Sequence, residues 1–377
     1  MNTSKKPLGE VFQLFFKLGC VAFGGPAAHI AMMEDEVVTK RKWTTHQHFL
    51  DMVGATNLIP GPNSTQMTMH CGHVRAGWPG LWVAGLAFII PAMFFTLILA
   101  YIYVEYGQIP EVAPLFFGIK PAVIGIILSA TYKLGKKAFK TWQLSVLGVV
   151  VALLSVLGVG ELLLILLSGV LVALIFGIRN QFKTTHGIFP ALLLLKPVTL
   201  AISGASIFWT FLKIAFILFG SGYVLVAYID AELVERLGWL THSQLLDAIA
   251  IGQFTPGPVL TTATFIGYQL NGLSGALWAS LGIFLPSFFL VGLLVKLIPL
   301  MRKSKLLSQI LDAVNAAAVG IMLAVVLKLS YELSSSWQSI LLMVLSIAIT
   351  FRFKKISSFW IIIGGAILGY ILHVITG

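Results

Sequence analysis

Two lysines, Lys17 and Lys213, each lie inside an apolar run of this 377-residue chain. An ammonium group at membrane depth costs about 3 kcal/mol or more unless it is paired or hydrated, so such a residue usually marks a substrate path. Two lysines at matched positions can flank a doubly charged anion as point charges. The structural alternative is a lysine near a helix end whose ammonium group reaches the lipid headgroups.

The triplet Pro-Gly-Pro occurs twice inside apolar segments. Proline removes a backbone donor and clashes with the preceding turn, and glycine adds conformational freedom, so a helix must break at each triplet. The second proline suits the first position of a new half-helix, whose N–H groups and positive dipole end favour an anion. A packing kink is the structural alternative. The residues that predict these breaks are Pro60, Gly61, Pro62, Pro256, Gly257 and Pro258.

The turn that follows each triplet supplies the predicted substrate ligands. Hydroxyl and amide groups at a helix start add hydrogen-bond donors to the backbone N–H groups. These residues are Asn63, Ser64, Thr65 and Gln66 in the first copy and Thr261 and Thr262 in the second. Arg75 follows the second apolar segment, where its guanidinium group can bind an oxyanion through two hydrogen bonds or anchor the chain on the cytoplasmic side.

A second matched break is predicted six residues after each lysine. If both breaks open half-helices, up to four helix N-termini converge near the membrane midplane; close helix packing by small residues is the alternative. The residues concerned are Gly24, Gly25 and Pro26 in the first copy and Gly220, Ser221 and Gly222 in the second.

Three pairs of matched carboxylates lie near segment ends and are candidates for proton transfer or gating. Helix caps and surface ion pairs are the alternative, and Thr241 with Gln244 has the pattern of a capping box. The pairs are Glu34 with Asp230, Glu36 with Glu232, and Asp51 with Asp247. His29 lies in an apolar stretch and has no matched copy. It is a candidate proton relay, and a buried structural histidine is the alternative.

The elements that position these residues are duplicated. Residues 12–62 align with 208–258 at a constant lag of 196 residues without a gap, and the match then resumes at a lag of 195. A repeated half inside an apolar chain is typical of membrane transporters. We divide the chain into an N-terminal repeat (1–183), a connector (184–205) and a C-terminal repeat (206–377).

The composition requires lipid as the solvent. The chain is 58% hydrophobic and 10% charged, with a mean hydropathy of +0.94, which no soluble domain of this size could bury. The net charge of +11 lies in short loops between apolar runs and indicates topology, not nucleic-acid binding. The two cysteines form neither a disulfide framework nor a metal motif, so we expect no metal and no cofactor.

The apolar pattern predicts an all-α membrane protein with about six segments per half. Basic residues change sides at equivalent loops, so the halves are expected to be inverted relative to each other. We expect about thirteen spans, one of them in the connector, with the N-terminus in the cytoplasm and the C-terminus outside a cell membrane. As an alternative to crossing the membrane, the first two segments of a half can form re-entrant hairpins.

The motifs resemble those of the chromate ion transporter family in its long, fused two-half form. The resemblance rests on the residues at 23–26, 60–63, 75–78, 219–220 and 256–258. It implies export of chromate across the inner membrane with the proton gradient as the energy source. The family usually has glutamine three residues before the triplet; Gln253 keeps it, whereas Asn57 replaces it in the first half. It also often has paired arginines where this chain has Val74 and Arg75.

The sequence therefore predicts a secondary transporter of a tetrahedral dianion such as chromate, with sulfate or another oxyanion as an alternative and a homodimer left open. No GxxxxGKS/T motif is present, so ATP is not the direct energy source. A proton-coupled carrier of a non-anionic solute would depend on the matched carboxylates instead of the lysines. An intramembrane enzyme would need an HExxH motif or paired aspartates on one helix, which the chain lacks.

Overall fold

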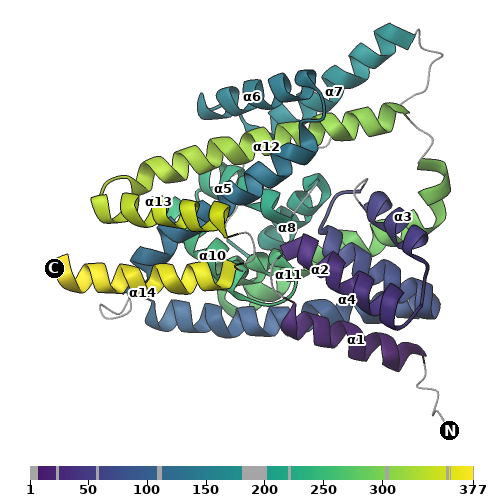
Figure 1. Cartoon of the computed structure of the whole chain (residues 1–377), viewed down its shortest axis with the longest axis horizontal. Coiled ribbons are helices and arrows are strands. Elements are labelled where there is room, and N and C mark those ends of the chain that lie inside the picture. Colours follow the sequence, from purple (N-terminus) through teal and green to yellow (C-terminus); the bar gives the residue numbers. More distant parts are fainter. Residues whose placement is uncertain are drawn as a thin grey trace.

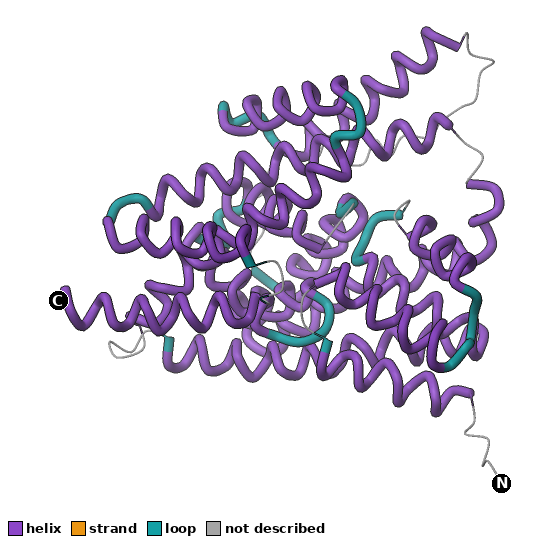
Figure 2. Tube along the Cα trace, in the orientation of Figure 1, coloured by secondary structure: helices purple, strands orange, loops and turns teal. Residues whose placement is uncertain are grey.

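A computed structural model of the chain describes residues 7–22, 25–56, 59–107, 113–180, 202–219, 222–301, 305–353, 356 and 358–376. The described residues form helices and short connections and contain no strand (Figures 1 and 2). The predicted all-α fold is confirmed. The predicted crossing in the connector, and the break residues Gly24, Gly220 and Ser221, lie outside the described residues.

The two halves present equivalent helices in the same order. The first half contains α1 (Pro7–Val21), α2 (Gly25–Glu34), the π-helix η1 (Asp35–Lys40), α3 (His46–Thr56), α4 (Asn63–Tyr106), α5 (Ala113–Ala138), α6 (Trp142–Val156) and α7 (Glu161–Asn180). The second half contains α8 (Gly204–Ile217), η3 (Gly222–Val224), α9 (Leu225–Ile229), the π-helix η4 (Asp230–Arg236), α10 (His242–Phe254), η5 (Val259–Thr261), α11 (Thr262–Met301), α12 (Lys305–Leu333), α13 (Trp337–Arg352) and α14 (Ser358–Thr376).

Five described stretches are long and apolar enough to cross a membrane, which makes this a multi-pass membrane protein. They are residues 63–106, 117–138, 259–295, 308–333 and 358–375. α6, α8, α13 and part of α7 are shorter apolar helices. Several of the predicted crossings are thus too short to span a bilayer as straight single helices.

α4 and α11 each fold back on themselves at a two-residue turn. The turn lies at Ala76–Gly77 in α4 and at Asn271–Gly272 in α11, where the backbone angles are not helical. A Cβ added to Gly72 would lie 2.3 Å from the carbonyl oxygen of Gly80, so the two legs touch through glycine. The second apolar segment predicted from the sequence (49–72) thus falls on α3 and the first leg of α4, and the third (78–104) falls on the second leg.

The segments before this turn also double back. Glu10, near the start of α1, accepts a hydrogen bond from the indole N–H of Trp43, which follows η1, and lies 3.8 Å from Arg41. Because residues 10 and 43 flank the break after α1, α1 and α2–η1 form a hairpin. α3 and the first leg of α4 form the next hairpin, and its apex is the proline triplet. Each half therefore places two broken hairpins side by side.

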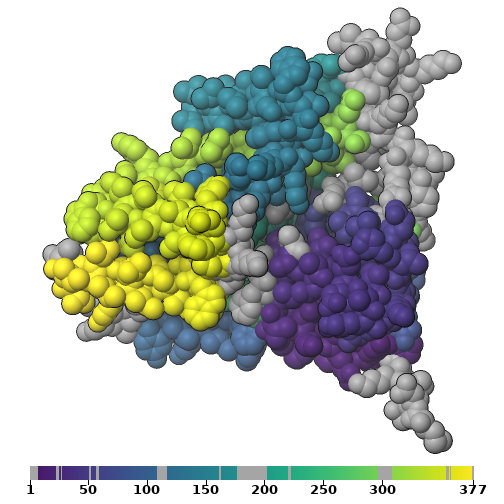
Figure 3. Space-filling view, in the orientation of Figure 1, coloured from purple at the N-terminus to yellow at the C-terminus, as the bar shows by residue number. Residues whose placement is uncertain are grey.

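The remaining helices are exchanged between the halves. α5 of the first half packs against α13 and α14, and α12 of the second half packs against α6 and α7. The matched helices α5 and α12 run in opposite directions in Figure 1, as expected for inverted repeats. In the surface view, α6 and α7 (teal) form one edge, α13 and α14 (yellow) another, and the N-terminal hairpins (purple) a third (Figure 3).

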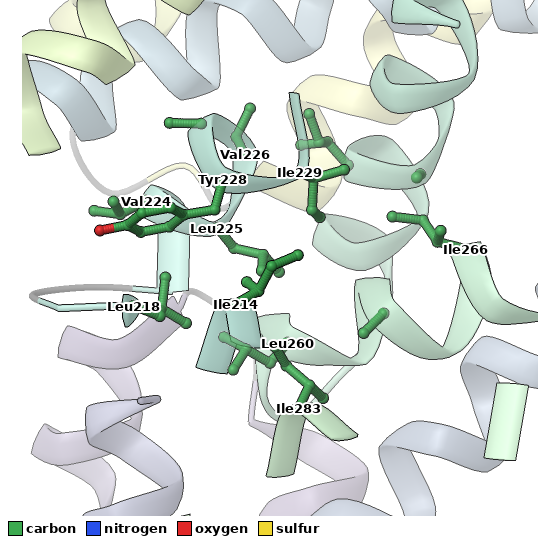
Figure 4. Close-up of a cluster of buried hydrophobic side chains, with 14 of the residues drawn as sticks. Ile214, Leu218, Val224, Leu225, Val226, Tyr228, Ile229, Leu260, Ile266 and Ile283 are labelled. Carbon is green, nitrogen blue, oxygen red and sulfur yellow. The ribbon is translucent and has the colours of Figure 1, made fainter. Parts of the chain in front are cut away.

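Helix caps and two apolar cores hold this frame. The predicted capping box is confirmed: the Thr241 hydroxyl accepts from the Gln244 backbone, and the Gln244 side chain accepts from the Thr241 backbone. One hydrophobic cluster joins α1, α2, α3 and α4 of the first half. A larger cluster joins the second-half hairpins to the exchanged helices, and Figure 4 shows its part around Leu218, Val224 and Leu260.

Candidate functional site

The chain is broken at both proline triplets. α3 ends at Thr56 and α4 begins at Asn63, while α10 ends at Phe254 and η5 begins at Val259. The second proline of each triplet is the N-cap of the next helix, with ψ of 104° at Pro62 and 129° at Pro258. Each proline therefore has an extended backbone and lies just before the first helical residue. The sequence predicted it at the first helical position, so the helix begins one residue later than predicted.

Each triplet is hydrogen-bonded to the first break of the other half. The N–H of Gly61 donates to the carbonyl of Leu218 at 2.6 Å, and the N–H of Gly257 donates to the carbonyl of Ala22 at 2.9 Å. Gly61 matches Gly257 and Ala22 matches Leu218 at the same lag of 196 residues. The four hairpin apices therefore meet at one place, and the two backbone bonds obey the pseudo-twofold relation of the repeats.

Both central glycines have conformations that disfavour a side chain. Gly61 has a φ of 117° and Gly257 a φ of 85°, values that L-residues rarely adopt. A Cβ added to Gly257 would lie 2.6 Å from the Cβ of Ala92 in α4. Glycine is therefore needed for the turn and also for the approach of the two halves.

The start of α4 is polar and buried. The backbone N–H of Gln66 reaches the carbonyl of Pro62 at 2.9 Å, and its side-chain N–H donates to the carbonyl of Pro60 at 2.7 Å. The hydroxyls of Thr65 and of Ser287, which lies on α11 close to Gly61, are buried and have no hydrogen-bond partner within the described part of the chain. Buried hydroxyls are seldom left unbonded, so this place is suited to a hydrogen-bonding ligand.

The second helix start is internally satisfied and more apolar. The Thr261 hydroxyl donates to the carbonyl of Pro258 at 3.0 Å, and the Thr262 hydroxyl donates to the carbonyl of Val259 at 2.8 Å. Leu260, which stands where the first half has Ser64, packs in the hydrophobic cluster with Leu218 (Figure 4). The helix starts after Pro62 and Pro258 thus have a similar backbone, but only the first has a buried side-chain hydroxyl without a hydrogen-bond partner among the described residues.

Other predicted residues also meet at the apices. A Cβ on Gly25, which opens α2 beside Pro26, would lie 2.8 Å from the hydroxyl of Tyr223, and this hydroxyl donates to the side-chain oxygen of Gln253 at 3.4 Å. Asn57, the counterpart of Gln253, lies outside the described residues. His29 is buried, and its Nε2 is 3.1 Å from the carbonyl of Ala22, which also accepts from Gly257.

Lys17 and Lys213 lie within α1 and α8, five residues before Ala22 and Leu218, whereas Arg75 lies at the far end of the first leg of α4. The Lys17 side chain is exposed on α1. Lys213 binds both carboxylate oxygens of Glu232 at 3.1 Å, and Arg75, beside the turn of α4, binds Glu10 at 2.8 and 3.0 Å. The structure therefore does not bring these three cations to the helix starts, and their predicted contact with substrate stays a prediction.

Most of the predicted carboxylates form ion pairs. Glu34 lies 2.7 Å from His46, and at the matched positions Asp230 lies 3.0 Å from His242. The Asp51 side chain is outside the described residues, and Asp247 is treated below. Glu36 pairs with Lys40 and Arg41, and Glu232 pairs with Arg236 as well as with its lysine.

One of these groups contains potential metal ligands. Asp230, Glu235 and His242 place one ligand atom each within 4.8 Å of one another. The Lys328 ammonium lies 3.5 Å from Glu235, and His242 Nδ1 contacts Glu332. Because cationic and hydrogen-bonding partners are already present, we interpret the group as an ion-pair network joining η4, α10 and α12.

Comparison with known proteins identifies the family. A profile described as chromate transporter matches residues 9–174 and again residues 205–370. A chromate transport protein of Cupriavidus metallidurans is 30% identical over 97% of this chain and 93% of its own length. A probable chromate transport protein of Synechococcus elongatus is 30% identical over 97% of this chain and 95% of its own length.

A shorter relative corresponds to a single half. An uncharacterized transporter of Bacillus subtilis, YwrA, is 27% identical over 147 residues, which are 38% of this chain and 83% of that protein. No solved structure matches the chain. The two profile matches coincide with the two halves seen in the fold. The chain belongs to the chromate transporter family, in the long form that joins two copies of the family's unit.

Proposed function

We propose that this protein transports chromate, or a sulfate-like tetrahedral dianion, and binds it at the start of α4. The observation that carries the proposal is that the buried hydroxyls of Thr65 and Ser287, beside a helix N-terminus at the junction of the halves, have no hydrogen-bond partner among the residues the structure describes. The backbone donors and the dipole of a helix start favour an anion. The substrate is inferred from the names of the full-length relatives.

The interlocked apices support a mechanism of alternating access. Residues 63–72 at the start of α4 are all buried, so a ligand reaches them only if the apices separate. The two bonds from Gly61 to Leu218 and from Gly257 to Ala22 are related by pseudo-symmetry. In the proposed cycle the halves rock against each other, and one of these bonds opens toward each side of the membrane in turn.

The remaining parts of the proposal concern charge and direction. Lys17, Lys213 and Arg75 make the approach to the apices positive, and Lys213 must release Glu232 if it is to touch the substrate. We propose export across the cell membrane driven by the proton-motive force, with a cytoplasmic N-terminus and an external C-terminus. Positive charge along a path raises the local concentration of an anion even without direct contact.

Uptake into inverted membrane vesicles tests the proposal. Labelled chromate and labelled sulfate are offered with and without a pH gradient, and we expect saturable chromate uptake that the gradient increases. Preference for sulfate over chromate would reassign the substrate within the same site. Absence of uptake of either anion by protein confirmed in the vesicles would refute the proposed function.

Two conservative variants test the site. Thr65→Val and Ser287→Ala each remove a hydroxyl that has no partner among the described residues, so the fold loses no hydrogen bond and we expect normal thermal stability. Chromate affinity should fall by about tenfold, because a hydrogen bond to a charged ligand contributes about 1.5 kcal/mol. Thr261→Val, whose hydroxyl already bonds to Pro258, is the matched control and should retain affinity. Unchanged affinity in both test variants would place the substrate elsewhere.

A further inference from the structure

A buried carboxylate joins the two halves away from the proline triplets. Asp247 on α10, in the second half, accepts a hydrogen bond from the hydroxyl of Tyr103 on α4 at 2.7 Å. The ammonium group of Lys120 on α5 lies 3.4 Å from the same carboxylate oxygen and donates to the hydroxyl of Ser243 at 2.6 Å. Two first-half side chains thus hold one second-half carboxylate.

The surroundings leave this carboxylate dependent on one cation. Its side chain is 4% exposed, against 21% for Lys120, and its second oxygen has no hydrogen-bond partner within the described residues. Asp230 and Glu235 of η4 contact α10 at His242, its first residue, and not at Asp247. Four titratable groups on α9, α11 and α14 form no hydrogen bond or ion pair with Asp247 among the described residues; they are Tyr228, Tyr268, Tyr370 and His373.

The lysine and the tyrosine of this arrangement have no counterparts in the sequence of the other half. The lag that aligns the repeats pairs Asp247 with Asp51, so both halves carry a carboxylate here. The position equivalent to Lys120 is Asn315, and the position equivalent to Tyr103 is Ile298. If the carboxylate served only to pack the pseudo-symmetric frame, both copies would have similar partners. The unique lysine and tyrosine indicate a task that only one half performs.

We propose that Asp247 is the proton-binding group that couples the proton gradient to oxyanion transport, with Lys120 as its counter-ion across the junction of the halves. This inference rests on the proposed function and adds the site of coupling. Ionised Asp247 attracts Lys120 and accepts from Tyr103, which holds α10 against α4 and α5. A buried charge needs such partners, so the ion pair and the closeness of the halves depend on each other.

One proton changes this balance. The carboxylate takes a proton from water at the side where Lys120 is exposed and becomes a neutral acid, while Lys120 stays an ammonium ion. The attraction between the halves is then lost and they can move apart. After the movement, Asp247 releases the proton to water on the opposite side, and the ion pair forms again. One proton thereby crosses for each cycle of the two halves.

Transport assays on the reconstituted protein distinguish coupling to the proton gradient from binding of chromate. Liposomes containing the wild type or Asp247→Asn are tested in two assays: accumulation of labelled chromate driven by a pH gradient, and exchange of labelled for unlabelled chromate at equal pH. We expect Asp247→Asn to lose accumulation by about tenfold or more, a typical size for coupling between linked sites, and to keep exchange. Lys120→Gln should also lose accumulation, because its carboxylate then favours the protonated state.

Asp312→Asn is the matched control. Asp312 on α12 pairs with Lys140 at 2.7 Å, so it also joins the two halves, but Lys140 is 57% exposed and the pair is solvated. This variant should accumulate chromate as the wild type does. Normal accumulation by Asp247→Asn, an equal loss in Asp312→Asn, or loss of exchange together with accumulation would overturn the inference. A wild type that exchanges chromate without responding to the gradient would overturn it as well, whereas a wild type that does not exchange at all would instead refute the proposed function.

Discussion

Replacing Gly257 by alanine tests whether the apices must interlock. The glycine has a φ of 85°, and an L-residue in the left-handed region costs about 1–2 kcal/mol. The added Cβ would lie 2.6 Å from the Cβ of Ala92 and 3.2 Å from the carbonyl oxygen of Gly19. Neither atom belongs to a flexible side chain, so the backbone itself must shift. Overpacking of this kind costs about 1–3 kcal/mol.

The two costs together are about 2–5 kcal/mol. The nearest way to relieve them is to move the triplet away from α1 and α4, which lengthens the bond from Gly257 to Ala22. We therefore expect Gly257→Ala to lower the midpoint of thermal unfolding, followed by tryptophan fluorescence of the purified protein, and to abolish chromate uptake. Both readouts are needed, because loss of uptake alone would not locate the strain.

Three further glycines make the experiment quantitative. Gly160→Ala has an ordinary φ and no atom within 4 Å of the added Cβ, so it should be neutral. Gly77→Ala has a φ of 63° and a ψ of −152° but open space, so it carries only the conformational cost of a region that almost only glycine adopts, about 1–3 kcal/mol. Gly61→Ala meets the movable side chains of Gln66 and Ser287. A Gly257→Ala protein as stable and active as Gly160→Ala would refute the interlocked arrangement.

Three other predictions follow from contacts outside the apices. Burial opposes ionisation of Glu36, but hydrogen bonds from Arg41 and Lys40 outweigh it and hold the pKa of this carboxyl below its usual value. Its stabilising contribution is therefore present at neutral pH and lost as the pH falls through the lowered pKa, and Glu36→Gln should flatten the acid side of a plot of unfolding midpoint against pH. Gly118→Val should separate α5 from α14 and lower the unfolding midpoint, since an added Cβ would lie 2.0 Å from a carbonyl oxygen of α14. Lys213→Met should abolish chromate export in vesicles while the protein remains in the membrane, and full export by this variant would remove that lysine from the substrate path.

The breaks and the repeat could be predicted because they have direct signals in the residues. Proline cannot continue a helix, and two triplets at the same lag reveal both the break and its symmetry. The turn inside α4 lies in the gap between the second and third predicted apolar segments (49–72 and 78–104), so its position was predicted as well. Only Ala76 and Gly77 leave the helical region there, and Pro79 shortly afterwards is tolerated early in a new helix. Apolar periodicity indicates which residues are helical, but it does not report whether consecutive helices fold back.

The chemistry of the site was less accessible from the sequence. The hydrogen bonds donated by Gly61 and Gly257 join backbone atoms, so the residue types in the sequence do not predict them. Ser287 is a lone serine within an apolar helix, a residue that usually bonds to its own helix, and nothing local indicates its place beside Gly61. The pairing of Lys213 with Glu232 had a clue in retrospect, since Glu36 and Glu232 are matched, but a separation of 19 residues gives no contact rule for a broken helix.

The differences between the halves matter more for transport than their likeness. In an inverted-repeat transporter the inward-open and outward-open states arise when the halves exchange conformations. Two identical halves would give these states equal free energy, and no ligand or proton could favour one of them except through its own gradient. Side chains that break the symmetry are therefore where the bias between states is set. The described structure contains two such places. The first is the polar start of α4, whose counterpart at η5 is apolar. The second is the ion pair of Asp247 with Lys120, because the position equivalent to Lys120 in the second half is Asn315. Substrate and proton are accordingly expected to act at separate points of one symmetric frame.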